Sequence, residues 1–342
     1  MPELTLQSAL LTFLVSAVVI VIAGTKLSKY GDLLADLTGL GRVWIGALLL
    51  AGATSLPEAL TCISAVTWVD APDLAIGDLF GACMLNMFTL ALVDLLNREA
   101  KVWHSVSYSQ ILIAGLAIML AALVALFIIA DLDTALFGRI GWDTMLIAAL
   151  YVFGLRFILQ YETDTQNNSG SKAEASRTEG SMSLRRASLL FAAAAVTIII
   201  VAPILAKSAK SIADITGIGT SFIGASLVAL ATSLPEMVTS LAAVRLGAYD
   251  LAVGNLFGSN AFNMMLVFPT DIAYSKGSLL ASVGPNQTIA GLLAIVLMSI
   301  GIMGMIFRKE KRWYLLEPDS IILAIVYFVG LFLLFRLGVT FS

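Results

Sequence analysis

The sequence predicts an all-α membrane protein of ten transmembrane helices, arranged as two inverted five-helix repeats with broken helices 2 and 7. Three observations predict it: an apolar composition, ten long hydrophobic segments, and a motif that occurs twice. Of the 342 residues, 59% are hydrophobic and 13% are charged, against about 45–50% and about 25% in soluble domains. The mean hydropathy of +0.95 and the net charge of −3 exclude a soluble, disordered or nucleic-acid-binding chain.

The hydrophobic segments set the number of helices. A bilayer needs about 20 apolar residues per helix, and residues 111–130 form an uncharged apolar run of that length. A polar segment, 162–186, separates five spans from five, which predicts a linker between two repeats, 1–161 and 187–342. The remaining predicted spans are residues 7–30, 43–68, 73–96, 142–161, 187–213, 220–245, 250–273, 286–307 and 318–338.

The basic residues predict the orientation. With ten spans, 15 of the 20 Lys and Arg residues fall in or beside the loops of one side, which includes the linker. Because basic residues accumulate on the cytoplasmic side of membrane proteins, we expect a cytoplasmic linker and both termini outside the cell membrane. The other side carries only Arg139, Lys207, Lys210, Lys276 and Arg336.

The two halves repeat one another. Residues 45–58 (IGALLLAGATSLPE) and 223–236 (IGASLVALATSLPE) are identical at 11 of 14 positions, and residues 73–88 align with 250–265. The repeated regions span about 43–94 and 220–271. Each half has five spans, an odd number, so the second half enters the membrane from the opposite side. Inverted repeats of this kind are typical of secondary transporters, with the substrate near the midplane.

Two glutamates lie in the middle of predicted spans. Glu58 and Glu236 occupy equivalent positions of the two halves, and no basic residue lies near either along its span. A charged side chain at the bilayer centre costs at least about 2.5–3.5 kcal/mol. Two buried carboxylates repel one another, so a cation or protons must neutralise them. Their combined charge balances one Ca²⁺, two Na⁺ or two H⁺.

Proline and hydroxyl residues surround both glutamates. Pro57 and Pro235 lack a backbone N–H, which leaves carbonyl groups of the preceding turn free to line a cavity. With the glutamates, these groups form an all-oxygen site, which hard cations such as Ca²⁺ and Na⁺ prefer. One histidine and two cysteines offer no zinc or copper site, and no cofactor is expected. The contributing neighbours are Ala51, Thr54, Ser55, Ala229, Thr232 and Ser233.

The third and eighth spans add a second layer of polar residues. Asn86 and Asn263 are equivalent and are expected to bridge the glutamates or bind an ion, and Ser259 lies one turn before Asn263. Asp78 either attracts cations or makes a helix cap or polar helix contact. We expect the paired residues Asp94 and Asp271 to be interfacial or gate residues, and Gly77, Gly81, Gly254 and Gly258 to allow close helix packing.

The duplicated ATSLPE motif, followed in the second half by GNLFGSNAFN, resembles the cation/calcium exchanger superfamily and most closely its sodium/calcium exchanger branch. The resemblance covers nearly the whole chain. It implies that spans 1 and 6 slide across a rigid core to alternate access to the site. Glu58 and Glu236 would be the central Ca²⁺ ligands, helped by backbone oxygens of Thr54 and Thr232. Asn86 and Asn263 would lie at the centre, and Ser55, Ala51, Ser233, Ala229 and Ser259 would line Na⁺ sites.

The sequence departs from this pattern in a few places. Ala82 replaces a serine, Asn263 stands where some members have aspartate, and Asp78 and Cys83 replace asparagines. These changes predict weaker support for a third Na⁺. From the resemblance we expect an antiporter that exchanges Ca²⁺ for Na⁺. Because of these departures, Ca²⁺/H⁺, another cation/H⁺ or K⁺-linked exchange is the alternative. The expected partners are the lipid bilayer and small inorganic cations, a monomer suffices, and an enzyme, a channel and a nucleic-acid partner are disfavoured.

Overall fold

A computed structural model describes residues 5–97, 102, 106–131, 135–136, 140–168, 182–216, 229–307 and 318–337. Within these residues the fold is helical apart from one two-residue antiparallel pair, in which β1 (Ala135–Leu136) lies beside β2 (Ile140–Gly141). Nine helices of the described part are long and apolar enough to cross a membrane. The predicted all-helical membrane class is therefore confirmed.

The described helices follow the predicted spans in order. The first half contains α1 (Leu6–Thr38), α2 (Arg42–Trp44), the π-helix η1 (Ile45–Leu50), α3 (Ala51–Thr54), α4 (Leu56–Ser64), the π-helix η2 (Ala65–Val69), α5 (Pro72–Leu96), α6 (Ser109–Ala130) and α7 (Trp142–Asn168). The second half contains α8 (Leu184–Ile215), α10 (Leu234–Arg245), α11 (Tyr249–Met265), α12 (Val267–Ala273), the 3₁₀-helix η4 (Leu280–Ser282), α13 (Gln287–Phe307) and α14 (Pro318–Arg336).

Both boundaries of the predicted linker 162–186 differ from the sequence prediction. The helix α7 continues to Asn168, so residues 162–168 of the predicted linker are helical. The helix α8 begins at Leu184, so residues 184–186 of the predicted linker are also helical. Residues 169–181 lie outside the described part, and so do residues 217–228 at the start of the predicted span 220–245. The polar composition of residues 162–168 does not prevent a helix, because backbone hydrogen bonds propagate from the apolar turns before them.

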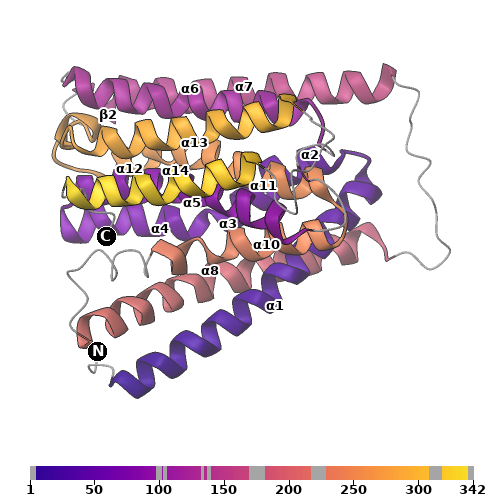
Figure 1. The fold of residues 1–342 in the computed structure, drawn as a ribbon, viewed down its shortest axis with the longest axis horizontal. Coiled ribbons are helices and arrows are strands. Elements are labelled where there is room, and N and C mark those ends of the chain that lie inside the picture. Colours follow the sequence, from indigo (N-terminus) through magenta and orange to yellow (C-terminus); the bar gives the residue numbers. More distant parts are fainter. Residues whose placement is uncertain are drawn as a thin grey trace.

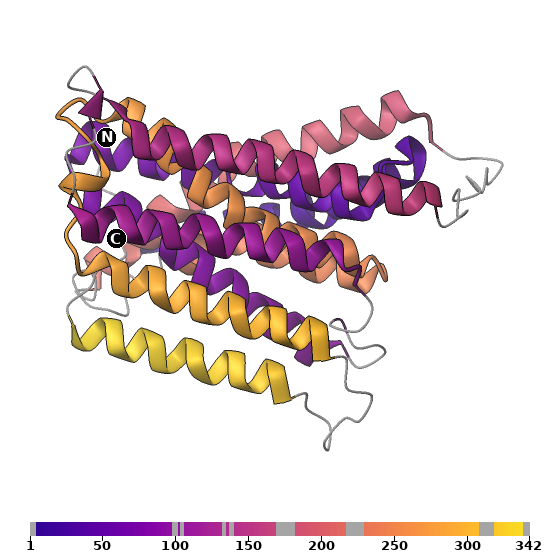
Figure 2. The ribbon, with the colours of Figure 1, turned by 90° about the horizontal axis from the view of Figure 1, so that it is seen from above.

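Most helices run side by side, whereas α1 and α8 cross the bundle obliquely and pack against one another (Figure 1). In Figures 1 and 2, α1 begins and α14 ends at the left, whereas α7 ends and α8 begins at the right. The two outer ends of the helical chain therefore lie at one end of the bundle, and the junction between the halves lies at the other.

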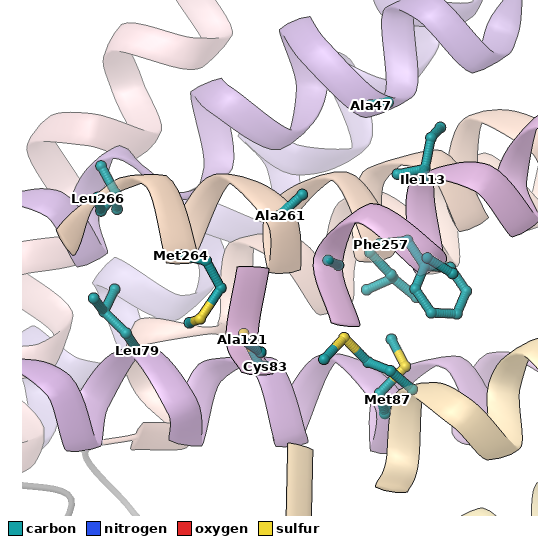
Figure 3. Close-up of a cluster of buried hydrophobic side chains, with 14 of the residues drawn as sticks. Ala47, Leu79, Cys83, Met87, Ile113, Ala121, Phe257, Ala261, Met264 and Leu266 are labelled. Atoms are coloured by element: carbon teal, nitrogen blue, oxygen red, sulfur yellow. The ribbon is translucent and has the colours of Figure 1, made fainter. Parts of the chain in front are cut away.

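The helices η1 and α11 pack closely through small residues on both. A Cβ atom on Gly258 would lie 2.6 Å from the Ala47 Cα, and one on Gly46 would lie 2.7 Å from the Leu251 carbonyl oxygen. The expected role of Gly258 in close packing is thereby confirmed. Between α5 and α11, buried apolar side chains such as Leu79 and Met264 fill a common layer (Figure 3). Helices in a bilayer associate through such packing rather than through the hydrophobic effect.

Asp94, near the end of α5, fixes a helix junction. Its Oδ1 atom accepts a hydrogen bond from the backbone N–H of Val102 (3.1 Å), eight residues later. Its Oδ2 atom accepts one from the hydroxyl of Ser320 (2.7 Å), the third residue of α14. The buried carboxylate therefore joins the end of α5 to the start of α14.

Asp271, the counterpart of Asp94, makes the equivalent connections, in its case from the second half to α7 of the first half. Its Oδ1 atom accepts a hydrogen bond from the backbone N–H of Leu279 (2.8 Å), again eight residues later. Its Oδ2 atom accepts one from the hydroxyl of Thr144 (2.7 Å), the third residue of α7. The two aspartates that we expected to be interfacial or gate residues thus make equivalent helix-anchoring hydrogen bonds.

Candidate cation site

The site begins where the helix backbone is interrupted before each buried glutamate. Ser55 separates α3 from α4 with φ −91° and ψ 3°, and Ser233 precedes α10 with φ −88° and ψ 7°. In each case proline lies in the first turn of the following helix. A proline at this position costs the following helix no hydrogen bond, because the first N–H groups of a helix have no partner within that helix. The repeated SLPE sequence therefore produces the same local backbone twice.

The two glutamates are buried within reach of the opposite half. Glu58 on α4 and Glu236 on α10 are each only 1% exposed. The Ser55 hydroxyl donates a hydrogen bond to Oε1 of Glu236 (3.2 Å), which links the first half to the second. The second carboxylate oxygen, Oε2, of each glutamate has no hydrogen-bond partner within the described part of the chain.

Four further predicted site residues also have an unpartnered, buried oxygen atom within the described residues. An unpaired buried polar group costs about 1–3 kcal/mol, and a charged one costs more. A hard cation surrounded by these atoms would satisfy them, and Ca²⁺ takes six to eight oxygen ligands. The residues therefore fit Ca²⁺ or Na⁺ as cargo. With Oε2 of the two glutamates, the set comprises Oδ1 of Asn86 and Asn263 and Oγ of Ser233 and Ser259.

The predicted backbone ligands carry equivalent hydrogen bonds. The Ala51 carbonyl accepts the N–H of Ser55 (3.0 Å) and the hydroxyl of Thr54 (3.3 Å). In the second half, the Ala229 carbonyl accepts the N–H of Ser233 (3.1 Å) and the hydroxyl of Thr232 (2.8 Å). Both threonine hydroxyls thus lie within hydrogen-bond distance of the backbone carbonyl three residues earlier, and that of Thr54 lies within reach of Asn255 as well.

Asn260 is a buried residue that holds a predicted site residue and that sequence reasoning missed. Its Oδ1 atom accepts a hydrogen bond from Nδ2 of Asn86 (2.9 Å), and its Nδ2 atom donates to the Cys83 carbonyl (3.5 Å). These bonds join α5 to α11 and hold the Asn86 side chain, whose Oδ1 atom is unpartnered among the described residues. The sequence feature that could have identified it is the GSN motif, in which Asn260 is the asparagine. The equivalent position in the first half is Cys83.

Asn255 is the second residue that sequence reasoning did not assign to the site. Its Oδ1 atom accepts the Thr54 hydroxyl across the two halves (3.3 Å). Its Nδ2 atom donates to the hydroxyl oxygens of Thr239 (3.1 Å) and Ser240 (2.9 Å). Asn255 therefore positions Thr54, and a neutral amide is required because it both accepts and donates.

Asp78, the counterpart of Asn255, has different surroundings. It is buried, and its Oδ2 atom lies 3.9 Å from Sγ of Cys62. It is thus a third carboxylate in the region of Glu58. Its neighbour Ala82 is also buried and supplies no side-chain oxygen, as expected from the sequence.

The ion pairs of the described residues lie away from the glutamates. Arg42 contacts Asp32 (2.5 Å) and Asp36 (3.4 Å), and Lys276 contacts Asp70. The hydrogen bond to Asp70 raises the pKa of Lys276 above its usual value. No described basic side chain forms an ion pair with Glu58 or Glu236, so the predicted need for a cation at the glutamates is retained.

A polytopic helical bundle with a buried, oxygen-rich site between its halves defines a membrane cation transporter. The chain belongs to the sodium/calcium exchanger protein family, whose profile it matches over residues 8–160 and 186–336. The family resemblance stated from the sequence motifs is therefore confirmed. This is a family of exchangers rather than enzymes, so cation exchange is its general activity.

Three individual relatives are similar to this chain, and one of them is named as a sodium/calcium exchanger. The chain is 28% identical to an uncharacterized membrane protein of Methanocaldococcus jannaschii over 63% of this chain and 65% of that protein, just under two thirds. It is 27% identical to the inner membrane protein YrbG of Escherichia coli over 80% and 82%. It is 30% identical to the sodium/calcium exchanger MaX1 of Methanosarcina acetivorans over 46% and 43%.

A solved structure shares the fold. The sodium-calcium exchanger NCX_Mj superposes with a TM-score of 0.70 over 95% of this chain and 98% of its own, at 20% sequence identity. At this identity the likeness concerns the arrangement of helices. The similarity in helix arrangement covers nearly the whole chain, including both halves.

Proposed function

We propose that this protein is a secondary active antiporter that exchanges Ca²⁺ for Na⁺ by alternating access. The observation that carries the proposal is the set of six unpartnered buried oxygens, two of them from carboxylates. Their charge balances one Ca²⁺ or two Na⁺, so the two ions compete for the same groups. The similarity to the Methanosarcina relative, a sodium/calcium exchanger, supports this choice of ions.

The ligands are assigned by their chemistry. Glu58 and Glu236, with carbonyl oxygens of Thr54 and Thr232, bind Ca²⁺ at the centre. Asn86 and Asn263 lie beside the glutamates and supply amide oxygens. The flanking Na⁺ positions use the residues Ser55, Ala51, Ser233, Ala229 and Ser259.

The transport cycle uses two inverted repeats with broken helices 2 and 7. The equivalent anchoring of Asp94 and Asp271, and the equivalent backbone at Ser55 and Ser233, support the repeat. The α1–α8 pair slides across the remaining helices to expose the site to either side. Both termini lie outside the cell membrane, the linker between 1–161 and 187–342 is cytoplasmic, and one monomer completes the cycle.

The counter-ion is the part of the proposal with a specific alternative. Ala82 removes one hydroxyl from a flanking Na⁺ position, and Asn263 removes a carboxylate that some family members have. Asp78 instead adds a carboxylate near Glu58. These three residues favour fewer coupled Na⁺ ions, and Ca²⁺/H⁺, another cation/H⁺ or K⁺-linked exchange is the second candidate.

The test is ⁴⁵Ca²⁺ uptake into proteoliposomes loaded in turn with Na⁺, with K⁺ or with an acidic interior, at a clamped membrane potential. Uptake driven only by internal Na⁺ supports Ca²⁺/Na⁺ exchange. Uptake driven by protons or by K⁺ without a Na⁺ effect favours the second candidate. If no gradient drives Ca²⁺ uptake, the assignment of Ca²⁺ as cargo is wrong.

A further inference from the structure

A groove separate from the cation site lies between α7 and the segment formed by α2 and η1. Its volume is about 780 Å³, within the roughly 300–1,000 Å³ of known ligand sites. Trp44 and Leu48 line one wall, and α7 residues from Tyr151 to Asp164 line the other. None of the six unpartnered oxygens of the cation site belongs to this lining.

The lining changes from apolar to polar along α7. Val152, Leu155 and Leu159 provide an apolar stretch, and Gln160 and Asp164 follow at the polar end. At about 1.5 Å per residue, the lining between residues 151 and 164 extends about 20 Å along the helix. A phospholipid in one leaflet changes in the same direction, from an apolar acyl chain in the membrane interior to a polar headgroup at the surface.

Two opposite charges line the groove, Asp164 at its polar end and Arg156 two turns before it. Arg156 and Asp164 are both exposed and both line it. Neither forms an ion pair with another described residue. An arginine near the end of an apolar segment extends its guanidinium toward the headgroups, where it pairs well with phosphate. Asp164, two turns further on, complements an ammonium group beyond that phosphate.

A buried hydroxyl provides a third point of recognition. Tyr151 is only 5% exposed, lines the groove, and has no hydrogen-bond partner for Oη among the described residues. It lies five residues before Arg156, about 7.5 Å deeper along the helix. In a phospholipid the ester carbonyls also lie deeper in the membrane than the phosphate. An ester carbonyl oxygen at that depth can accept a hydrogen bond from the tyrosine hydroxyl.

We propose that this groove binds one phosphatidylethanolamine molecule. Its phosphate pairs with Arg156, its ammonium with Asp164, and an ester carbonyl accepts the Tyr151 hydroxyl, while an acyl chain covers the apolar stretch. The Tyr151 ring lies 6.2 Å from that of Phe262, the neighbour of the site residue Asn263. The bound lipid therefore supports a wall of the cation site, whichever ions that site carries.

The test uses a phosphatidylethanolamine with a photoactivatable acyl chain, in proteoliposomes that hold the full-length protein. Cross-linked peptides are mapped by mass spectrometry, so the result is independent of transport. We expect labelling in residues 44–48 and 151–164. Unlabelled phosphatidylethanolamine should compete about tenfold better than phosphatidylglycerol, because only the former has an ammonium group to pair with Asp164.

Matched variants test the assigned contacts. Arg156→Gln and the groove-filling Val152→Trp should each reduce labelling about tenfold, as expected for one lost charge-assisted contact or a blocked groove. The controls Arg186→Gln and Phe153→Trp alter exposed residues outside the lining and should leave labelling unchanged. Asp164→Asn should abolish the preference for phosphatidylethanolamine over phosphatidylglycerol, and a surface change of this kind preserves the fold.

Three results would overturn the proposal. The first is labelling mapped elsewhere on the chain, and the second is equal competition by phosphatidylglycerol. The third is labelling that does not respond to Arg156→Gln in protein that elutes as a single folded species. Failure of Ca²⁺ flux would leave the mapped label unchanged, so the lipid site and the transport function are tested separately.

Discussion

Replacing one buried glutamate separates an ion-binding role from a structural one. Glu58→Gln keeps the shape of the side chain and removes its negative charge. Because the two carboxylates have no described basic partner, the ion-free protein should lose no ion pair and should unfold at no lower temperature than the wild type. A structural role would instead predict a lower unfolding temperature.

The expected loss of Ca²⁺ binding follows from the charge removed. Two unit charges 4 Å apart interact by about 4 kcal/mol at an effective dielectric constant of about 20, and Ca²⁺ carries two charges. A loss of about 4 kcal/mol already weakens binding about a thousandfold. At a Ca²⁺ concentration of about 100 Kd, binding stabilises the wild type by about 2.7 kcal/mol. The same concentration should stabilise Glu58→Gln by about 0.1 kcal/mol or less.

The assay is thermal unfolding of the purified protein with and without Ca²⁺, paired with ⁴⁵Ca²⁺ flux. Glu236→Gln should behave like Glu58→Gln. Glu162→Gln is a matched control, since Glu162 is buried but binds Ser109 outside the site, and it should keep the Ca²⁺-dependent stabilisation. The reasoning is refuted if both site variants retain this stabilisation and exchange Ca²⁺ at the wild-type rate.

Three other changes test single contacts. Ala82→Ser restores a hydroxyl in the first half and should lower the Na⁺ concentration for half-maximal exchange severalfold in a Na⁺ titration of flux; an unchanged value would contradict a Na⁺ position there. Gly258→Ala places a Cβ 2.6 Å from the Ala47 backbone and should destabilise the protein by about 1–3 kcal/mol, measured by thermal unfolding, unless α11 can shift without loss. Asp271→Ala removes an acceptor of three hydrogen bonds and should raise amide hydrogen exchange at residues 141–144 and 279; unaltered exchange would show that these bonds do not hold the junction.

The class of fold could be predicted because a bilayer restricts which backbone structures can span it. A spanning segment must satisfy its own backbone, so a run of about 20 apolar residues implies a helix. The same rule shows why the end of α7 was predicted wrongly. Residues 162–168 are polar and were assigned to a linker, but once a helix has left the hydrocarbon, composition no longer decides where it ends.

The charged and hydroxyl members of the proposed site could be named from the sequence, because a carboxylate buried in a membrane is costly unless a cation or a proton neutralises it. Asn260 and Asn255 were not assigned. Their importance depends on which side chain faces them across the two halves, Asn86 in one case and Thr54 in the other. Spacing along one helix carries no information about such pairs. Three-dimensional contacts were required to distinguish an amide that binds a ligand residue from one that only packs.

The two halves share the local backbone at Ser55 and Ser233 but contribute unequally to the proposed site. Of the six unpartnered oxygens, the first half provides those of Glu58 and Asn86, and the second half provides four. The difference has two causes: Ala82 has no hydroxyl to match Ser259, and the Ser55 hydroxyl donates to Glu236 whereas that of Ser233 has no described partner. We therefore predict that ion binding is stronger on the side of α10 and α11 than on the side of α4 and α5.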